Sequence, residues 1–354
     1  MEQQLKTAKL EYESNSFDSE AFKKRLFIRL NKKQLGVSYN TQRSAKNFLL
    51  GKKQWVAAAV AVIFLGIIFN QPVIAAIKAT FWGNHAGVEK AVENGYQQEV
   101  QGASVKSQGI ETKVTNVVVD KSKLGLAINI KFDDIKSIKD IDHVYLDLLI
   151  TDGNGRVISG DGYPERLDAG SENSTDIANK NNGELKYNVL FQSPTASFPQ
   201  MSELKVEIKR VLLYKNKYGN QGPSKTIEGS WKNSVALDEQ FVKAKGVAYP
   251  SQSTSNDVNV ISAEMSPTGF AVKFIVNTPV DESLVDKART QLVDSKGNSF
   301  SNSGIANMER TADNKDLFSM VYEVSGFDQS DSFKFIVKDI NGKDFVATLV
   351  RAIK

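Results

Sequence analysis

The chain has 354 residues, 45 of them Lys or Arg and 41 Asp or Glu, and 41% of its residues are hydrophobic. This length allows two or three domains of ordinary size. Because the chain contains no cysteine, disulfides, thiolate zinc sites, iron–sulfur clusters, thiol nucleophiles and lipid anchors through cysteine are excluded. An exported domain without disulfides depends on its own core, which indicates a full-sized fold.

Charge is unevenly distributed along the chain. Residues 1–54 contain 12 basic and 5 acidic residues, and all ten charged residues of 21–54 are basic. The residues after Lys78 contain 32 basic and 36 acidic residues. This change of sign falls at the one long apolar run of the sequence. Such a step indicates a membrane boundary.

Residues 1–54 are predicted to form a basic cytoplasmic arm with one short amphipathic helix. Phe22, Leu26 and Leu30 recur at a spacing of four, while Lys23 and Lys24 begin a set of basic residues on the other faces. Three interpretations remain open for this helix: binding to anionic lipid, binding to a cytoplasmic partner through the apolar stripe, or a topology signal alone. No nucleic-acid-binding motif accompanies the charge, so direct binding to nucleic acid is not expected.

Residues 55–77 are predicted to form a transmembrane helix. The stretch 55–69 has no polar side chain, and a second apolar stretch follows at 73–77. Taken together they give a helix of about 34 Å, which is enough to span the hydrocarbon core. Basic residues are concentrated before this segment, so the positive-inside rule places the N-terminus in the cytoplasm and the C-terminal region outside the cell.

Asn70, Gln71 and Pro72 interrupt the apolar segment. Proline removes a backbone donor, and amide side chains are costly in hydrocarbon unless they are hydrated or paired. Either the bilayer ends at this point and the helix emerges, or these residues form a weak turn that an intramembrane protease can use.

Residues 78–99 form the predicted juxtamembrane segment. Within it, the sequence predicts a short helix that ends at Gly95, with Val88, Ala91 and Val92 on one face.

The remainder is predicted to be mainly β, with two tandem Ig-like β-sandwich domains at 100–243 and 246–354. Alternating apolar residues, bounded by Gly, Asn, Asp and Ser, indicate many short strands. These fall at 110–119, 124–132, 144–151, 185–191, 204–213, 257–265, 270–276, 290–293, 317–324, 333–337 and 345–350.

A faint internal repeat supports two related domains. Residues 126–132 parallel 270–276, and 150–155 parallel 292–297, at a spacing of 142–144 residues. A third pair, 202–208 and 331–337, keeps the same order at a shorter spacing.

The sequence contains no recognisable catalytic or metal-binding signature. The only histidines, His85 and His143, are interpreted as ordinary surface or strand residues that do not share a site. Asp-Gly-Asn-Gly at 152–155 fails the spacing of a calcium loop and is interpreted as a hairpin turn. The acidic residues of 161–172 are interpreted as solvated, and Trp231 as a core or edge aromatic, with a ligand platform as the alternative. We therefore expect no enzyme, no cofactor and no metal.

Four short segments stand out within this layout. They are Gly-Val-Glu-Lys-Ala-Val-Glu-Asn-Gly-Tyr at 87–96, Gly-Ile-Glu-Thr-Lys-Val at 109–114, Gly-Ser-Trp at 229–231 and Ser-Pro-Thr-Gly at 266–269. With the basic arm and the membrane helix, they resemble a family of Gram-positive single-pass membrane proteins with uncharacterised exterior sandwich domains. The resemblance implies an anti-sigma-factor-like negative effector of an extracytoplasmic-function sigma factor. The chain departs from many anti-sigma domains because it lacks a His/Cys zinc motif and its arm is too short for a four-helix domain.

Two functional hypotheses follow. In the first, the exterior domains sense an envelope or cell-surface ligand, and the arm, through residues 17–35, holds a cytoplasmic partner such as a sigma factor until proteolysis near the membrane releases it. In the second, the chain is a cell-surface binding or adhesion module, and the arm only sets its topology.

Overall fold

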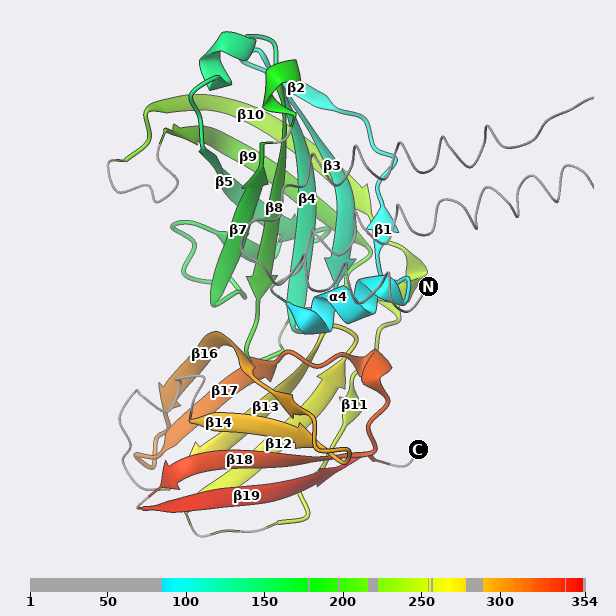
Figure 1. Ribbon diagram of the computed structural model, residues 1–354, viewed down its shortest axis with the longest axis vertical. Coiled ribbons are helices and arrows are strands. Elements are labelled where there is room, and N and C mark those ends of the chain that lie inside the picture. The colour runs from blue at the N-terminus through cyan, green and yellow to red at the C-terminus, as the bar shows by residue number, and fades with distance from the viewer. Residues whose placement is uncertain are drawn as a thin grey trace, which may run out of the picture. The chain divides into compact units, whose positions relative to one another are not determined.

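The computed structural model describes residues 85–352 and is mainly β (Figure 1). Gaps in this description fall at 178, 197, 216–221, 254, 256, 278–288 and 341. The predicted arm at 1–54 and the predicted membrane helix at 55–77 lie outside the described residues. Within the described part, no helix has the length and apolarity needed to cross a bilayer.

Residues 98–236 form two antiparallel sheets, called here the first sheet pair. One sheet has the order β1 (Gln98–Glu99), β3 (Ile110–Val119), β4 (Lys123–Phe132), β8 (Glu184–Gln192) and β7 (Gly170–Asp176), with β2 (Val105–Ser107) paired to β3. The other has the order β10 (Lys225–Ala236), β9 (Glu203–Tyr214), β5 (His143–Asp152) and β6 (Val157–Gly160). Three short helical elements lie outside the strands: η1 (Ile135–Ile138), η2 (Lys180–Asn182) and α5 (Glu239–Val242).

Residues 247–350 form the second sheet pair, also antiparallel. One sheet has the order β11 (Val247–Ala248), β12 (Val258–Ser266), β13 (Gly269–Val276), β17 (Asp316–Tyr322) and β16 (Asn302–Arg310). The other has the order β15 (Ser299–Phe300), β14 (Thr290–Asp294), β18 (Ser332–Ile340) and β19 (Lys343–Val350). The short helix η4 (Gly326–Asp328) lies between β17 and β18.

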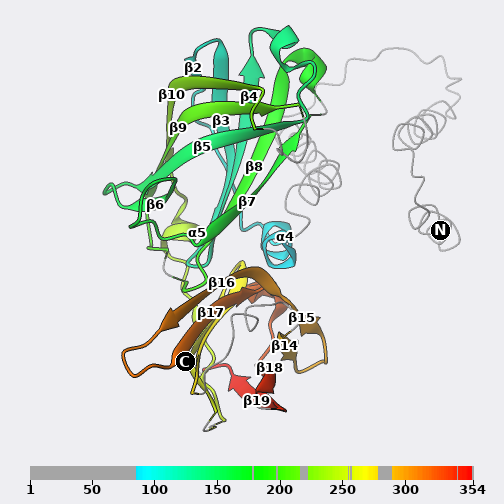
Figure 2. The same ribbon diagram turned by 90° about the vertical axis from the view of Figure 1, so that its left-hand side faces the viewer.

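Each sheet pair has its own hydrophobic core. In β4, Leu124, Leu126 and Ile128 have no exposed surface, as their alternation in the sequence predicts. They belong to one core cluster with apolar residues of β5 and β9, which lie in the facing sheet (Figure 2). The core of the second sheet pair is rich in aromatic rings, and the ring centroids of Phe270 and Phe333 lie 5.0 Å apart. Burial of this apolar surface is the main stabilising contribution in both.

The two sheet pairs have the same strand order. β3-β4-β8-β7 corresponds to β12-β13-β17-β16, and β10-β9-β5-β6 corresponds to β19-β18-β14-β15. The segments of the predicted repeat occupy matching places, because 126–132 lies in β4 and 270–276 in β13, while 202–208 leads into β9 and 331–337 into β18. The internal repeat therefore has a structural counterpart in every pair of segments.

The remaining pair of repeated segments, 150–155 and 292–297, forms the same hairpin turn twice. In each turn the aspartate, Asp152 or Asp294, accepts through Oδ1 the N–H groups of the residues two and four positions later, at 2.9 and 2.8 Å. Gly155 and Gly297 adopt φ values of +85° and +87°. This oxygen thus accepts hydrogen bonds from the backbone of its own turn, and the prediction of a hairpin turn is confirmed.

Replacing Gly297 with Ala should lower the free energy of unfolding by about 1–2 kcal/mol, because a Cβ disfavours the left-handed conformation. No heavy atom lies within 4 Å of the place an added Cβ would take, so the loss reports backbone conformation alone. Gly297→Asn is the matched control, and its loss should be smaller because asparagine tolerates this conformation better. Urea unfolding measures both, and equal losses would contradict this account of the turn.

Candidate functional site

Helix α4 (Ala86–Glu93) is the first described element of the chain, and its apolar face is buried. Val88, Ala91 and Val92 have no exposed surface, as the sequence pattern predicts. Gly95 adopts φ +83°, and its N–H donates to the carbonyl of Val92 at 3.0 Å. The predicted end of the helix at this glycine is confirmed, since a left-handed residue after the last turn is a common way to stop a helix.

The N-terminus of α4 is capped by a residue of the second sheet pair. His85, the N-cap residue, makes no side-chain capping hydrogen bond. Instead, the Gly87 N–H donates to Glu323 Oε2 at 3.3 Å, across 236 positions of sequence. A carboxylate here satisfies a free N–H and is favoured by the helix dipole. The first turn of α4 therefore depends on a long-range contact.

Close packing requires glycine at position 87. A Cβ on Gly87 would lie 2.3 Å from the carbonyl oxygen of Thr268, in the turn between β12 and β13. Real Cβ atoms do not approach a backbone oxygen so closely, so any other residue would displace this turn. Two of the four segments that stand out in the sequence, 87–96 and 266–269, thus meet here.

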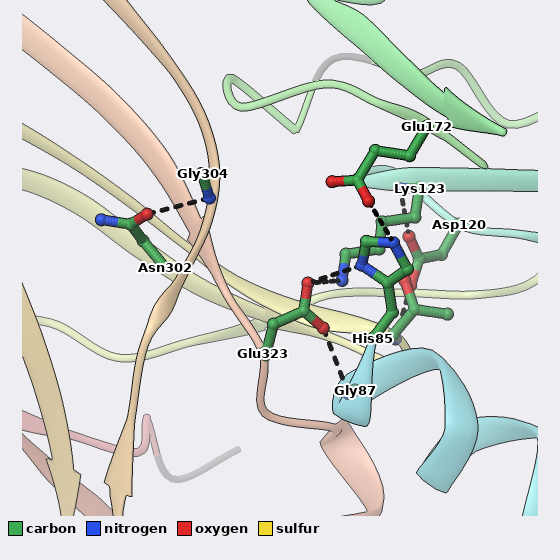
Figure 3. A network of polar contacts seen from close by, with 9 residues as sticks. His85, Gly87, Asp120, Lys123, Glu172, Asn302, Gly304 and Glu323 are labelled. Atoms are coloured by element: carbon green, nitrogen blue, oxygen red, sulfur yellow. Dashed lines mark hydrogen bonds and ion pairs between the residues drawn. The ribbon is translucent and has the colours of Figure 1, made fainter. Parts of the chain in front are cut away.

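An ion pair between Lys123 and Glu323 lies at the centre of the site (Figure 3). Lys123 Nζ is 2.6 Å from Glu323 Oε1, and their side chains are 0% and 14% exposed. His85 Nδ1 lies 3.2 Å from the same oxygen, and His85 Nε2 lies 3.3 Å from Glu172 Oε2. Burial acts to raise the pKa of Glu323, but Lys123 and His85 outweigh it and lower the pKa to about 2. Glu323 is therefore ionised at neutral pH.

Asp120 makes a second buried link to the same turn. Its Oδ2 accepts the N–H and the hydroxyl of Thr268, both at 2.7 Å, and its Oδ1 accepts the N–H groups of Ser122 and Lys123 at 2.8 and 3.0 Å. Burial raises the pKa of Asp120, and the four hydrogen bonds act in the opposite direction. We call His85, Asp120, Lys123, Thr268 and Glu323 the junction network.

Tyr96 fixes the other end of α4. Its hydroxyl donates to the Val119 carbonyl at 2.7 Å, and its ring lies 5.0 Å from that of Phe241 and 6.3 Å from that of Phe327. Phe241 belongs to α5 and Phe327 to η4, which follows the second sheet pair's β17. Both ends of α4 are thus in contact with residues from distant parts of the chain.

Hydrogen bonds and ion pairs connect the residues of the junction network, and the network borders an open cleft of about 770 Å³. The cleft lining includes Lys90, Glu172 and Phe300 beside His85 and Glu323. Within the described residues, no group of three or more His, Cys, Asp or Glu has a geometry that could hold a metal ion. The arrangement is suited to holding α4 and the two sheet pairs together.

Two predictions about single residues have opposite outcomes. His85 was expected to be an ordinary surface or strand residue and is instead 7% exposed inside the junction network, so this prediction is wrong. Trp231 is fully buried, and its Nε1 donates to the Ile110 carbonyl at 2.9 Å. A Cβ on Gly229 would lie 2.4 Å from the Trp231 ring. The core interpretation of Trp231 is confirmed, and the segments 109–114 and 229–231 also meet.

The acidic residues at 161–172 were expected to be solvated, and this is wrong for Asp168. Asp168 is 7% exposed, and Glu172 lies in β7, where it contacts His85. No sequence pattern predicted a functional role for the other residues of the junction network, Asp120, Lys123, Thr268 and Glu323. Each of them is an ordinary polar residue at a strand end or in a turn, without a local signal of burial.

All residues predicted to contact a partner or to weaken the membrane helix lie outside the described residues. These are Phe22, Lys23, Lys24, Leu26, Leu30, Asn70, Gln71 and Pro72.

One family model matches part of the chain. Residues 50–132, from the last residues of the predicted arm to the end of β4, match a family described as "Domain of unknown function (DUF4179)". A search of curated proteins gave no match. Among solved structures, "The crystal structure of the conserved domain protein from Bacillus anthracis" aligns with 13% identity and a TM-score of 0.43, over 73% of this chain and 90% of that one.

Replacing Glu323 with Gln should lower the free energy of unfolding by about 3–5 kcal/mol, because Lys123 is then left buried without its carboxylate. Lys121 and Glu264 provide a matched control, since their pair has the same 2.6 Å separation but side chains 37% and 32% exposed. Glu264→Gln should cost only about 0–1 kcal/mol. Urea unfolding gives both values, and a similar loss in the two variants would contradict a special role for the buried pair.

The stabilisation by Glu323 should depend on pH in a defined window. Its pKa is about 2 in the folded chain, whereas the ordinary pKa of a glutamate side chain is 4.5. A carboxylate with a lowered pKa stabilises the fold above pH 4.5 and loses this effect as the pH falls toward 2, by about 3 kcal/mol in all. The difference in unfolding free energy between wild type and Glu323→Gln should therefore shrink between pH 4.5 and 2. A constant difference would show that Glu323 acts through shape and not charge.

Proposed function

We propose that the chain is a single-pass membrane regulator with its sheet pairs outside the cell and its basic arm in the cytoplasm. The step in charge around 55–77 supports this topology. The DUF4179 match at 50–132 joins the predicted membrane helix to α4 and the first strands in a single region, which supports treating them as one functional segment. In this proposal the arm binds a cytoplasmic partner, for which a sigma factor is the candidate, and the chain catalyses no reaction.

We also propose that each sheet pair is an Ig-like sandwich. In such a domain the first, second, fifth and fourth strands share one sheet, and the third, sixth and seventh share the other. The orders β3-β4-β8-β7 and β10-β9-β5-β6 are compatible with that pattern. Domains of this type commonly present ligand-binding surfaces outside the cell, which suits a sensing role.

The observation that carries the regulatory proposal is the attachment of α4. This helix lies next in the chain after the predicted membrane segment, and it is held by Glu323 at its N-terminus and by the Thr268 turn against Gly87. A change in the junction network therefore acts directly on the chain that leads to the membrane. A regulator needs such a connection, whereas a passive surface module would be served by a flexible linker.

The same attachment suggests how a signal could be transmitted. A protease needs an extended, accessible chain, and α4 is helical with Val88, Ala91 and Val92 fully buried. An envelope ligand that enters the cleft beside His85 and loosens the network would expose this segment to cleavage. A second cut near Asn70, Gln71 and Pro72 would then release the arm and its partner.

The alternative function is a cell-surface binding or adhesion module without signalling. It requires no partner for the arm and no change at α4. The two functions differ most clearly in what the arm retains inside the cell.

The full chain, purified from membranes, should retain a sigma factor, and Phe22→Asp with Leu26→Asp should reduce that retention at least tenfold. Charged residues on the apolar stripe would remove the central contacts of a helix in a groove, which commonly contribute more than about 2 kcal/mol. Leu5→Asp with Leu10→Asp is the matched control, with the same added charge outside the stripe. Recovery of no sigma factor by either wild type or control would favour the surface-module function.

A further inference from the structure

His85 lies between two carboxylates that belong to different parts of the fold (Figure 3). Its Nδ1 is 3.2 Å from Oε1 of Glu323, which follows β17, and its Nε2 is 3.3 Å from Oε2 of Glu172, in β7. β7 is an edge strand of the first sheet pair, and β17 belongs to the second. His85 is itself the N-cap residue of α4. One imidazole ring therefore joins the start of α4 to both sheet pairs.

This arrangement suits the charged form of the ring. Glu323 is ionised at neutral pH, because its pKa is lowered to about 2, and an ionised carboxylate only accepts hydrogen bonds. The hydrogen bond between Nδ1 and Glu323 therefore places a proton on Nδ1. A neutral imidazole has one N–H, so its Nε2 would then present a lone pair to the carboxylate of Glu172. Only the imidazolium, with an N–H on each nitrogen, is attracted to both carboxylates.

The two glutamates are, within the described residues, the groups that make ion pairs with this ring. Other charged groups of the surrounding elements are Lys123 of β4, Asp120 of the turn before it, Glu89 and Lys90 of α4, and Asp328 of η4. Lys123 contacts Glu323, and Asp328 accepts a backbone N–H. A helix N-terminus, a buried position and the nearby Lys123 all oppose a positive charge on the ring, whereas the two carboxylates favour it. A charge held by opposing effects suits a switch.

Loss of the second proton releases Glu172 and not Glu323. Glu323 keeps Lys123 Nζ at 2.6 Å and the Gly87 N–H at 3.3 Å, and its side chain is only 14% exposed. The Glu172 side chain is 49% exposed, and among the described residues it forms an ion pair with His85 alone. It can turn into water at little cost, because a half-exposed carboxylate is easily hydrated. The N-cap of α4 then loses its contact with β7.

We propose that His85 is a pH-dependent switch: as imidazolium it links Glu172 of β7 to Glu323, and as neutral imidazole it releases Glu172 and loosens the start of α4. Histidine side chains change charge between about pH 5 and 8, so the link is present in mildly acidic conditions and is lost as the pH rises. This direction is opposite to that of Glu323 itself, whose effect is lost toward pH 2. The use of the switch as an exterior signal, which would expose α4 to cleavage when the pH rises, rests on the function proposed above.

Amide hydrogen exchange on the full chain in nanodiscs, at about pH 5.5 and about pH 8.5, tests the switch on either side of the histidine range. After correction for the intrinsic effect of pH on exchange, the α4 amides of wild type should lose at least threefold of their protection between the lower and the higher pH. Glu172→Gln and His85→Gln should each show the lower protection at both pH values, because neither variant retains a link between a charged ring and a carboxylate of β7.

Glu184→Gln is the matched control for Glu172→Gln. Glu184 is 50% exposed and lies 3.3 Å from Lys131, but a lysine does not change charge in this pH range. His143→Gln removes the other histidine of the chain. Both controls should keep the wild-type response.

Three results would overturn the proposal: equal α4 protection at the two pH values in wild type, a response that persists in Glu172→Gln or His85→Gln, or a response abolished by either control. None of these results depends on retention of a sigma factor, so the switch and the proposed function can fail separately.

Discussion

The buried ion pair between Lys123 and Glu323 is the interaction on which the rest of the junction depends. Glu323 accepts from Lys123 and from the first turn of α4, and it also contacts His85. Desolvating two charges is expensive, and a well-packed apolar contact of the same size is often as stable or more stable. The pair is therefore poorly explained as a source of stability alone. It gives the junction a defined geometry, and loss of either partner leaves a buried charge.

Helix α4 shows what this geometry achieves. A helix of eight residues is too short to be stable in water by itself, since isolated helices need about 12–15 residues. Its conformation therefore comes from its surroundings: the carboxylate of Glu323, the close contact of Gly87 with Thr268, and the anchoring of Tyr96. Because so short an element follows the predicted membrane segment, its folded state depends on whether the junction network is intact. This coupling of local to long-range structure is the physical basis of the proposed regulation.

Local patterns in the sequence predicted the central strands well. The alternation in 124–132 matches β4, and the runs at 204–213 and 270–276 match β9 and β13 within two residues. β7 was missed because both of its faces carry polar residues, as suits an edge strand. β10 was missed because a bulge between Glu228 and Trp231 breaks its alternation. In these two strands, polar faces or a bulge removed the alternation on which the strand prediction depends.

The junction network and the buried position of Asp168 could not be predicted from local sequence. Lys123 and Glu323 are 200 positions apart, and each is a common surface residue in an ordinary context. Asp168 is in a polar stretch that suggests solvation, and only the closure of the sheet edge by that stretch buries it. Short segments of the family resemblance were more informative, because 87–96 contacts 266–269 and 109–114 contacts 229–231. Glycines within them mark close approaches that depend on the full fold.

Amide hydrogen exchange of α4 in the full chain tests the central claim most directly. We predict that Glu323→Gln accelerates exchange in α4 at least tenfold, while the amides of β4 and β13 keep their protection and Glu264→Gln leaves α4 unchanged. That result would establish that the buried pair holds the helix next to the predicted membrane segment. Unchanged protection of α4 in Glu323→Gln would contradict the account, because the helix would then be stable without the contact on which the proposed coupling depends.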